Sequence, residues 1–141
     1  PVDGGPAAGW VVAPDDPAAY ATYLYWLHFT QGTLLPSELM RTAASRLASP
    51  DKSDPFVTRV AARADRAYAL VEQRLPQVPY LAGARFTAAD MMVAFPLTTM
   101  RRAIPRALGP HTIRWLHRLA DTTKLRQAKE KCDPGEPLIL D

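Results

Sequence analysis

The chain of 141 residues has few of the side chains from which metal centres and covalent catalytic sites are built. Its single cysteine, Cys132, excludes an internal disulfide and is typical of a reducing compartment, so we expect a cytoplasmic protein. The three histidines, His28, His111 and His117, do not stand at metal-ligand spacing, and no glycine-rich phosphate loop follows a strand. We therefore expect no metal cofactor and, from these residues alone, no self-contained catalytic site.

Long apolar runs are missing as well. No stretch of about 18 apolar residues occurs, so no membrane span is expected, and the first residues lack the charged and apolar regions of a signal peptide. A content of 48% hydrophobic and 22% charged residues fits one folded domain.

Positive charge is concentrated near the C-terminus. Residues 101–131 hold nine Lys or Arg against Asp121 and Glu130, although the net charge of the chain is only +3. Aromatic residues do not alternate with these basic residues, as a stacking surface for bases would require. A solvated helix face is therefore favoured and a nucleic-acid partner is not expected, with anion or RNA binding as the weaker alternative.

The apolar pattern predicts an all-α fold, since neither sustained period-two alternation nor a hairpin signal occurs. Residues 1–16 are expected to form a linker or lead-in, residues 17–132 a helical domain, and residues 133–141 an extended tail. Helices are predicted to start at Pro17, capped by Asp15 or Asp16, and at Pro55, where Asp54 provides the cap.

The first helix is predicted to run from Ala18 to about Leu47 and to bend near Gly32 and Pro36, because Pro36 cannot donate to the carbonyl of Gly32. A second helix should follow from about Pro55 to Leu75. Its expected inner side comprises Phe56, Val60, Ala64, Ala67, Leu70 and Val71.

Two carboxylates of this second helix, Asp65 and Glu72, share one face seven residues apart. We expect them to form surface ion pairs with Arg63 and Arg66.

A capping box is predicted at the start of the next helix, which begins near Ala88. The Thr87 hydroxyl should accept a backbone N–H near Asp90, and the Asp90 carboxylate should reach back to the N–H of Thr87. Phe86 and Met91 occupy the two positions of a hydrophobic staple. This is a structural device rather than a catalytic one.

Two further helical segments are expected after Gly109 and Pro110. The first has Ile113, Leu116 and Leu119 at three-residue spacing, and the second spans about residues 122–131.

Several of these motifs together resemble the C-terminal domain of glutathione transferases, and most closely a fungal and bacterial subgroup. The resemblance rests on Tyr23–Phe29 (YLYWLHF), Gly32–Pro36 (GTLLP), Tyr80–Gly83 (YLAG), Phe86–Asp90 (FTAAD) and Phe95–Leu97 (FPL). It covers about residues 18–131 and implies a glutathione-transferase-like bundle of about five to six helices, with the first long helix bent.

The chain departs from this family in two respects. It reads Thr122–Leu125 where members carry an Arg-Pro-Ala-Tyr type sequence, which leaves the packing near the mouth of the substrate site open. Nothing in it resembles the family's N-terminal thioredoxin-like domain, which binds glutathione and activates its thiol.

The resemblance therefore implies the electrophile-binding and dimer-forming half of a detoxifying, cytoplasmic glutathione transferase. Its implied partners are the thioredoxin-like domain, a second copy in a homodimer, and a hydrophobic electrophile; glutathione would be the co-substrate, bound mainly by the absent domain. This chain alone is expected to be inactive, so whether it counts as an enzyme depends on that domain. The alternative is a non-catalytic glutathione-transferase-like interaction module.

The apolar wall of the substrate site is expected near the bend of the first helix. Trp26, Phe29, Thr30 and Thr33 are the predicted substrate-binding residues, although Trp26 and Phe29 could instead pack in the core or at a dimer interface. An exposed apolar patch for the absent domain is expected to include Trp10, Tyr20 and Leu24.

Overall fold

The computed structural model describes residues 9–47, 54–98, 106–122, 127 and 131. Every secondary-structure element assigned within these residues is a helix, which confirms the all-α class. They are α1 (Pro17–Phe29), the π-helical turn η1 (Thr30–Leu34), α2 (Leu35–Leu47), α3 (Pro55–Arg74), α4 (Ala88–Thr98) and α5 (Pro110–Ala120).

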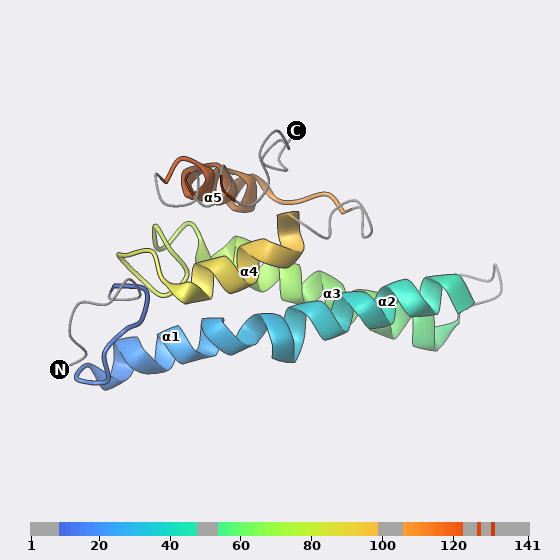
Figure 1. The fold of residues 1–141 in the computed structure, drawn as a ribbon. Helices are drawn as coiled ribbons and strands as arrows, with labels where there is room; N and C mark the ends of the chain where they lie inside the picture. Colours follow the sequence, from blue (N-terminus) through green and yellow to red (C-terminus); the bar gives the residue numbers. More distant parts are fainter. Residues whose placement is uncertain (1–8, 48–53, 99–105, 123–126, 128–130, 132–141) are drawn as a thin grey trace.

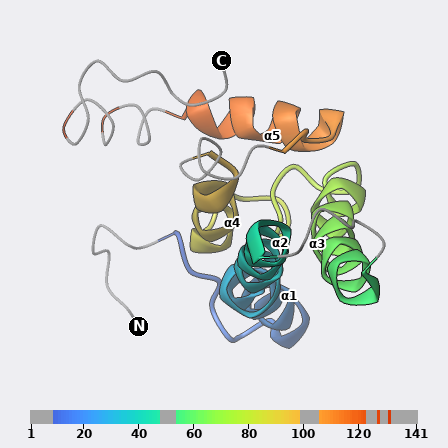
Figure 2. The same ribbon diagram turned by 90° about the vertical axis from the view of Figure 1, so that its right-hand side faces the viewer.

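The helices form a small bundle around one long rod. In Figure 1, α1, η1 and α2 follow one another as a single long helix, with α4 above α1 and α5 above α4. The view along this rod in Figure 2 places α3 beside it and α5 across the top. With the rod counted once, the described residues hold four helices, fewer than the five to six expected. The segment predicted at about residues 122–131 lies almost wholly outside the described residues.

Aspartate caps start two of the helices, as predicted. The Asp16 carboxylate accepts the N–H groups of Ala18 and Ala19 at 3.1 and 3.0 Å, and Pro17 occupies the first helical turn. The Asp54 carboxylate accepts the N–H of Phe56 at 2.7 Å in the same way. These caps satisfy N–H groups that the first turn of a helix leaves without intrahelical partners.

Where the sequence predicts a bend, near Gly32 and Pro36, the structure has the π-helical turn. The N–H of Leu35 bonds to the carbonyl of Thr30, five residues back, and α2 begins directly afterwards. Pro36 cannot donate to any carbonyl of the preceding turn, so a widened turn costs no hydrogen bond at that position.

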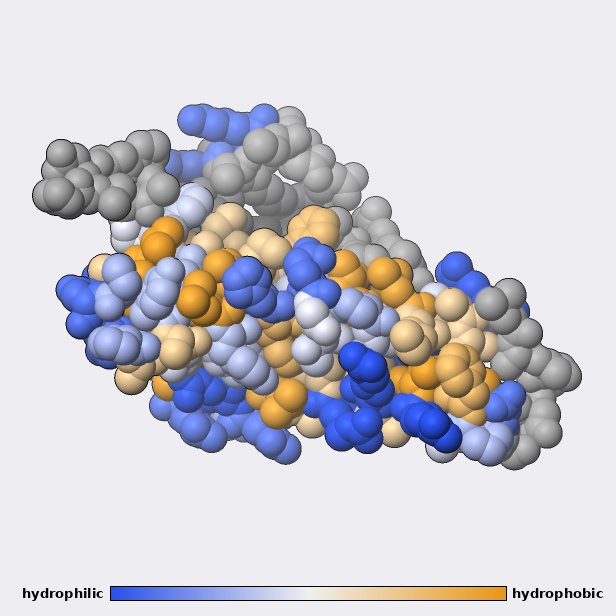
Figure 3. All heavy atoms as spheres, turned by 90° about the horizontal axis from the view of Figure 1, so that it is seen from below, coloured by the Kyte–Doolittle hydropathy of each residue, from blue (hydrophilic) through white to orange (hydrophobic). Residues whose placement is uncertain are grey.

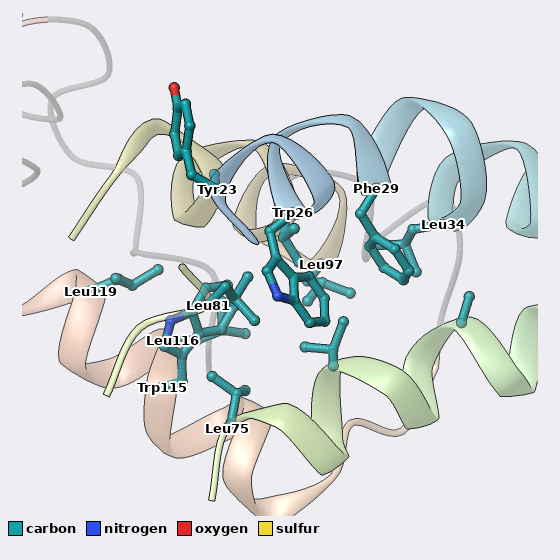
Figure 4. Close-up of a cluster of buried hydrophobic side chains, with 14 residues drawn as sticks. Tyr23, Trp26, Phe29, Leu34, Leu75, Leu81, Leu97, Trp115, Leu116 and Leu119 are labelled. Atoms are coloured by element: carbon teal, nitrogen blue, oxygen red, sulfur yellow. The ribbon is translucent and has the colours of Figure 1, made fainter. Parts of the chain in front are cut away.

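The core lies between the rod, α3, α4 and α5. Trp26, Leu81, Leu97 and Trp115 converge on it from four parts of the chain (Figure 4). Two expected inner residues lie outside it: the side chains of Phe56 and Leu70 are 56% and 42% exposed, and Ile113 of α5 is 39% exposed. On α5 the inward positions are taken by Trp115, Leu116 and Leu119.

The N-terminal segment is tied to the start of α4. The carbonyl of Trp10 accepts the N–H of Ala88 at 2.8 Å, and the Trp10 ring packs edge-on against Phe86. Every helix within the ranges that the structure describes is too short or too polar to cross a lipid bilayer.

Candidate functional site

The four predicted substrate-binding residues lie around the π-helical turn. Trp26 and Phe29 are 5% and 3% exposed, and their ring centroids are 5.0 Å apart (Figure 4). Thr30 is equally buried, whereas Thr33 is half-buried. In this chain Trp26 and Phe29 pack in the core. Of the four predicted residues, Thr33 is the one that reaches the surface.

The π-helical turn explains why Thr33 does not share the face of the other three. A regular α-helix would bring residues 26, 29, 30 and 33 onto one side. The π turn holds one more residue, so the following residues are rotated and Leu34, 1% exposed, takes the inward position instead. Tyr25 lies beside this cluster, 5.2 Å from Trp26 and half exposed, and was not among the predicted residues.

Two hydroxyl groups at this turn are buried without hydrogen-bond partners. Thr30 Oγ1 and Ser37 Oγ lie seven residues apart on the rod, and both residues are 1% exposed. A buried polar group without a partner costs roughly 1–3 kcal/mol. The hydroxyl groups of Thr30 and Ser37 can therefore each still form a hydrogen bond with another group.

Asp90 is the most highly connected polar side chain in the core. Its carboxylate accepts the N–H of Thr87 at 2.9 Å, as the capping box requires, and also the Thr87 hydroxyl at 3.1 Å. That hydroxyl therefore donates to Asp90, whereas the sequence pattern has it accepting a backbone N–H.

Two partners of Asp90 come from outside its own helix. The N–H of Leu81 donates at 2.9 Å and the indole N–H of Trp115 at 3.2 Å. Burial raises the pKa of the fully buried Asp90 carboxyl above its ordinary value, although these four hydrogen bonds act in the opposite direction. Asp90 thus joins α4, α5 and the 80–83 turn in one structural network, with no access for a substrate.

Glu72 caps α5 rather than forming the surface ion pair expected for it. Its carboxylate accepts the N–H groups of His111 and Thr112, both at 2.9 Å, and the Thr112 hydroxyl at 2.6 Å. Burial favours a higher pKa for Glu72, but these hydrogen bonds together hold it below its ordinary value. A Cβ atom at Gly109 would overlap the Glu72 carboxyl group, so a larger residue there would displace this carboxylate from the cap.

Asp65 also has a different partner from the one expected. It pairs with Arg106, whose guanidinium group contacts Glu38 Oε1 at 3.2 Å and lies 4.1 Å from the centre of the Tyr68 ring. Glu38 is 3% exposed and pairs with Arg41 at 2.5 Å. Burial, followed by the charge of Glu38, raises the pKa of Tyr68 above its ordinary value.

This ionic cluster holds the segment before α5 against α2 and α3. The pairs of Arg106 with Glu38 and Asp65 span 68 and 41 residues of sequence, so no local spacing marks Arg106 as a member, whereas Glu38 and Arg41 are three residues apart. The two negative carboxylates and the two positive guanidinium groups neutralise one another in charge. We therefore assign the cluster a structural role.

Possible metal ligands and one surface crevice were also compared with the predicted site. Within the described ranges, His, Cys, Asp and Glu side chains form no group of three or more that could hold a metal ion. A crevice of 120 Å³ lies between the N-terminal segment and the turn before α4, lined by residues that include Val11, Val12, Arg85 and Thr87. None of the four predicted substrate-binding residues lines this crevice.

Comparison with known proteins identifies the type of domain. Residues 54–123 match the sequence profile of the family described as "Glutathione S-transferase, C-terminal domain". No curated protein sequence matches the chain.

Solved structures share the fold. A glutathione S-transferase from Actinobacillus pleuropneumoniae superposes with a TM-score of 0.77 at 24% identity, over 93% of this chain and 58% of that one. A glutathione S-transferase from Pseudomonas fluorescens gives a TM-score of 0.62 at 20% identity, over 82% of this chain and 58% of its own.

A third neighbour was solved with glutathione bound. It is a theta class glutathione S-transferase from Xanthomonas axonopodis pv. citri, with a TM-score of 0.57 at 20% identity, over 81% of this chain and 61% of its own. The chain therefore spans about three fifths of the length of these transferases.

Proposed function

Because this chain carries a glutathione S-transferase C-terminal domain, we propose that it is the substrate-side and dimer-forming half of an enzyme that conjugates glutathione to hydrophobic electrophiles. The observation that carries the proposal is the agreement between the family match over residues 54–123 and the superposition of 93% of the chain on 58% of a glutathione S-transferase. The remaining two fifths of such a neighbour leave room for a thioredoxin-like domain, which would hold glutathione as co-substrate.

Chemistry requires that second domain. A thiol attacks an electrophile as thiolate, which needs a hydrogen-bond donor or positive charge beside the sulfur. The carboxylates of Asp90, Glu72, Glu38 and Asp65 are engaged in caps and ion pairs, so we propose that this chain contributes an apolar surface. Trp26, Phe29, Thr30 and Thr33 remain the proposed wall of the electrophile site: Thr33 would contact the electrophile, and the three buried residues would support the wall from inside the domain.

Exposed apolar side chains on α4 suit the docking of another domain. Met91 and Phe95 are one helical turn apart and 39% and 56% exposed. The patch expected from the sequence is partly occupied within the chain: Tyr20 and Leu24 pack against the core and Trp10 against Phe86. We propose that α4 and the outer parts of Tyr20 and Leu24 together face the thioredoxin-like domain.

Activity assays test the proposal directly. The purified 141-residue chain should show no turnover of chlorodinitrobenzene with glutathione, and measurable turnover by it would contradict the proposal. The natural transcript should be sequenced upstream of Pro1 and the longer protein assayed in the same way. The proposal fails if a thioredoxin-like segment is encoded there but the longer protein is inactive towards a panel of aryl halides and epoxides.

A matched pair of variants tests the binding surface in the active, longer protein. Thr33→Leu should raise or lower the KM for the electrophile several-fold while leaving the KM for glutathione unchanged. Gln31→Leu, at an exposed residue of the same π-helical turn, should leave both unchanged. Equal behaviour of the two variants would remove Thr33 from the site.

The second candidate is a non-catalytic interaction module. The exposed Met91 and Phe95 favour it equally, because a docking face needs no catalytic partner. An unrelated domain or a start codon upstream of Pro1, together with a defined dimer in sedimentation experiments, would support this candidate.

A further inference from the structure

A straight row of side chains lies along the exposed flank of α3. It consists of Phe56, Arg59, Arg63, Arg66 and Leu70, which recur every three or four residues and so share one side of the helix. All five are exposed, including the two apolar residues at the ends. Figure 3 shows this side of the molecule, with hydrophilic side chains gathered between hydrophobic ones along its lower edge.

The three arginines of this row have no partner among the described residues. The two carboxylates of α3 are engaged elsewhere, Asp65 by Arg106 and Glu72 by the N-terminus of α5. Like charges three and four residues apart on a helix destabilise it by roughly 0.2–0.5 kcal/mol per pair. The row is therefore an unfavourable arrangement in the isolated chain, and an acidic partner would relieve it.

We propose that this row is a docking surface for an acidic helix of another protein, with carboxylates facing the arginines and apolar residues facing Phe56 and Leu70. Guanidinium groups bind carboxylates in a two-pronged geometry, which makes arginine better suited than lysine to such pairing. Over residues 56–70 the row is about 21 Å long at 1.5 Å per residue, the length of about four helical turns. The heptad-like spacing of 56, 59, 63, 66 and 70 fits a second helix lying along it.

The placement of the apolar residues favours a protein helix over a membrane or a nucleic acid. A helix that lies on a bilayer has its apolar residues on the face below the basic ones. Here Phe56 and Leu70 are in line with the arginines, at the two ends of the row. A nucleic-acid backbone would meet phosphate along the whole row and leave both apolar ends without a partner.

Fluorescence anisotropy on the purified chain tests the proposal. The probe is a labelled synthetic peptide of about 20 residues, long enough to form helix, with Glu at the positions facing the arginines and Leu at those facing Phe56 and Leu70. Arg59→Glu/Arg66→Glu should weaken its binding at least about tenfold, because two attractive pairs become repulsive. The matched control, Arg85→Glu/Arg114→Glu, makes the same change in net charge at exposed residues elsewhere and should alter binding less than about twofold.

Two further measurements separate specific docking from general charge attraction. A peptide with Lys in place of Glu should bind the Arg59→Glu/Arg63→Glu/Arg66→Glu variant but not the natural chain. Leu70→Ser should weaken binding of the Glu peptide with no change in charge. Equal losses in both double variants, or no effect of Leu70→Ser, would overturn the proposal.

Binding to phosphatidylserine-containing vesicles or duplex DNA, lost in Arg59→Glu/Arg66→Glu while the Glu peptide fails to bind, would also overturn it. Circular dichroism of each variant, expected to match the natural chain because all these residues are exposed, shows that the fold is retained.

Discussion

At the scale of single residues, Asp90 is the side chain on which most of the core polar network depends. Asp90→Ala leaves the N–H groups of Leu81 and Thr87 and the indole N–H of Trp115 buried without their acceptor. We expect the free energy of unfolding to fall by about 3 kcal/mol or more. Urea denaturation measures it, and Asp15→Ala, at an exposed residue, serves as control. A loss below about 1 kcal/mol would show that the network contributes little.

The two embedded carboxylates give opposite pH dependences. The pKa of Glu72 is lowered in the folded chain, so its stabilising contribution is present above its ordinary pKa of 4.5 and is lost as the pH falls through the lower folded value. The pKa of Asp90 is raised, so the added stability that comes from a protonated carboxyl is present below its ordinary pKa of 3.8 and is lost as the pH rises through the folded value.

The Glu72→Gln variant isolates the first of these contributions. The difference in unfolding free energy between the natural chain and Glu72→Gln should be about 1–2 kcal/mol at neutral pH, the magnitude of a helix cap. It should shrink as the pH falls below 4.5, because protonation removes the carboxylate that accepts the three hydrogen bonds. A difference that stays constant between neutral and acidic pH would rule out the carboxylate cap.

Single residues also show how far the sequence alone can go. The bond between Asp90 and the N–H of Thr87 joins residues three apart, so a local motif reveals it. The bonds from Leu81 and Trp115 span nine and 25 residues, and no local pattern encodes them. Asp65 and Glu72 were recognised as sharing a face, but their partners, Arg106 and the N-terminus of α5, come from a distant segment.

At the scale of elements, the contact between α3 and α5 depends on the space that Gly109 leaves for Glu72. Gly109 has φ −71° and ψ 160°, which alanine adopts without strain, so the cost of Gly109→Ala comes from its Cβ meeting the Glu72 carboxylate. We expect a loss of about 1–2 kcal/mol, the magnitude of the cap that is displaced.

A double-mutant cycle in thermal or urea unfolding checks this cause. In the Glu72→Ala background the same Gly109→Ala substitution should cost less than about 0.5 kcal/mol, because the clash is gone. Gly32→Ala is the contrasting control: a Cβ there meets nothing within 4 Å, and alanine in a helix should stabilise by about 0.5–1 kcal/mol. Equal costs for Gly109→Ala with and without Glu72 would refute the clash.

The elements themselves could be predicted where caps and periodicity were strong. The starts of α1 and α3 follow from Asp16-Pro17 and Asp54-Pro55, which set the first turn through local hydrogen bonds. Inner faces are harder to predict: Phe56 and Leu70 fit the period of the α3 face but lie on its flank, where their side chains are 56% and 42% exposed. The π-helical turn also places Leu34 inward instead of Thr33. Gly32 and Pro36 predict a bend in this region but not this change of register.

At the scale of the whole molecule, the cluster around Arg106 ties the segment before α5 to α2 and α3. Arg106→Ala removes a charge pair from each of Glu38 and Asp65 and uncovers the ring of Tyr68. Glu38 is almost fully buried, and Arg41 would be its remaining ion-pair partner among the described residues. Breaking a buried pair on one side typically costs about 3–5 kcal/mol, and the 19% exposure of Arg106 places the expected loss nearer 2–3 kcal/mol.

Lysine should not restore this cluster. A single ammonium group cannot contact two carboxylates on different helices and also lie flat over the Tyr68 ring, so Arg106→Lys should recover less than half of the loss. Arg114→Ala, at an exposed residue of α5, should change stability by less than about 0.5 kcal/mol. Urea unfolding followed by tryptophan fluorescence measures all three variants, and full recovery by lysine would mean that net charge, rather than the geometry of the guanidinium group, holds α5 in place.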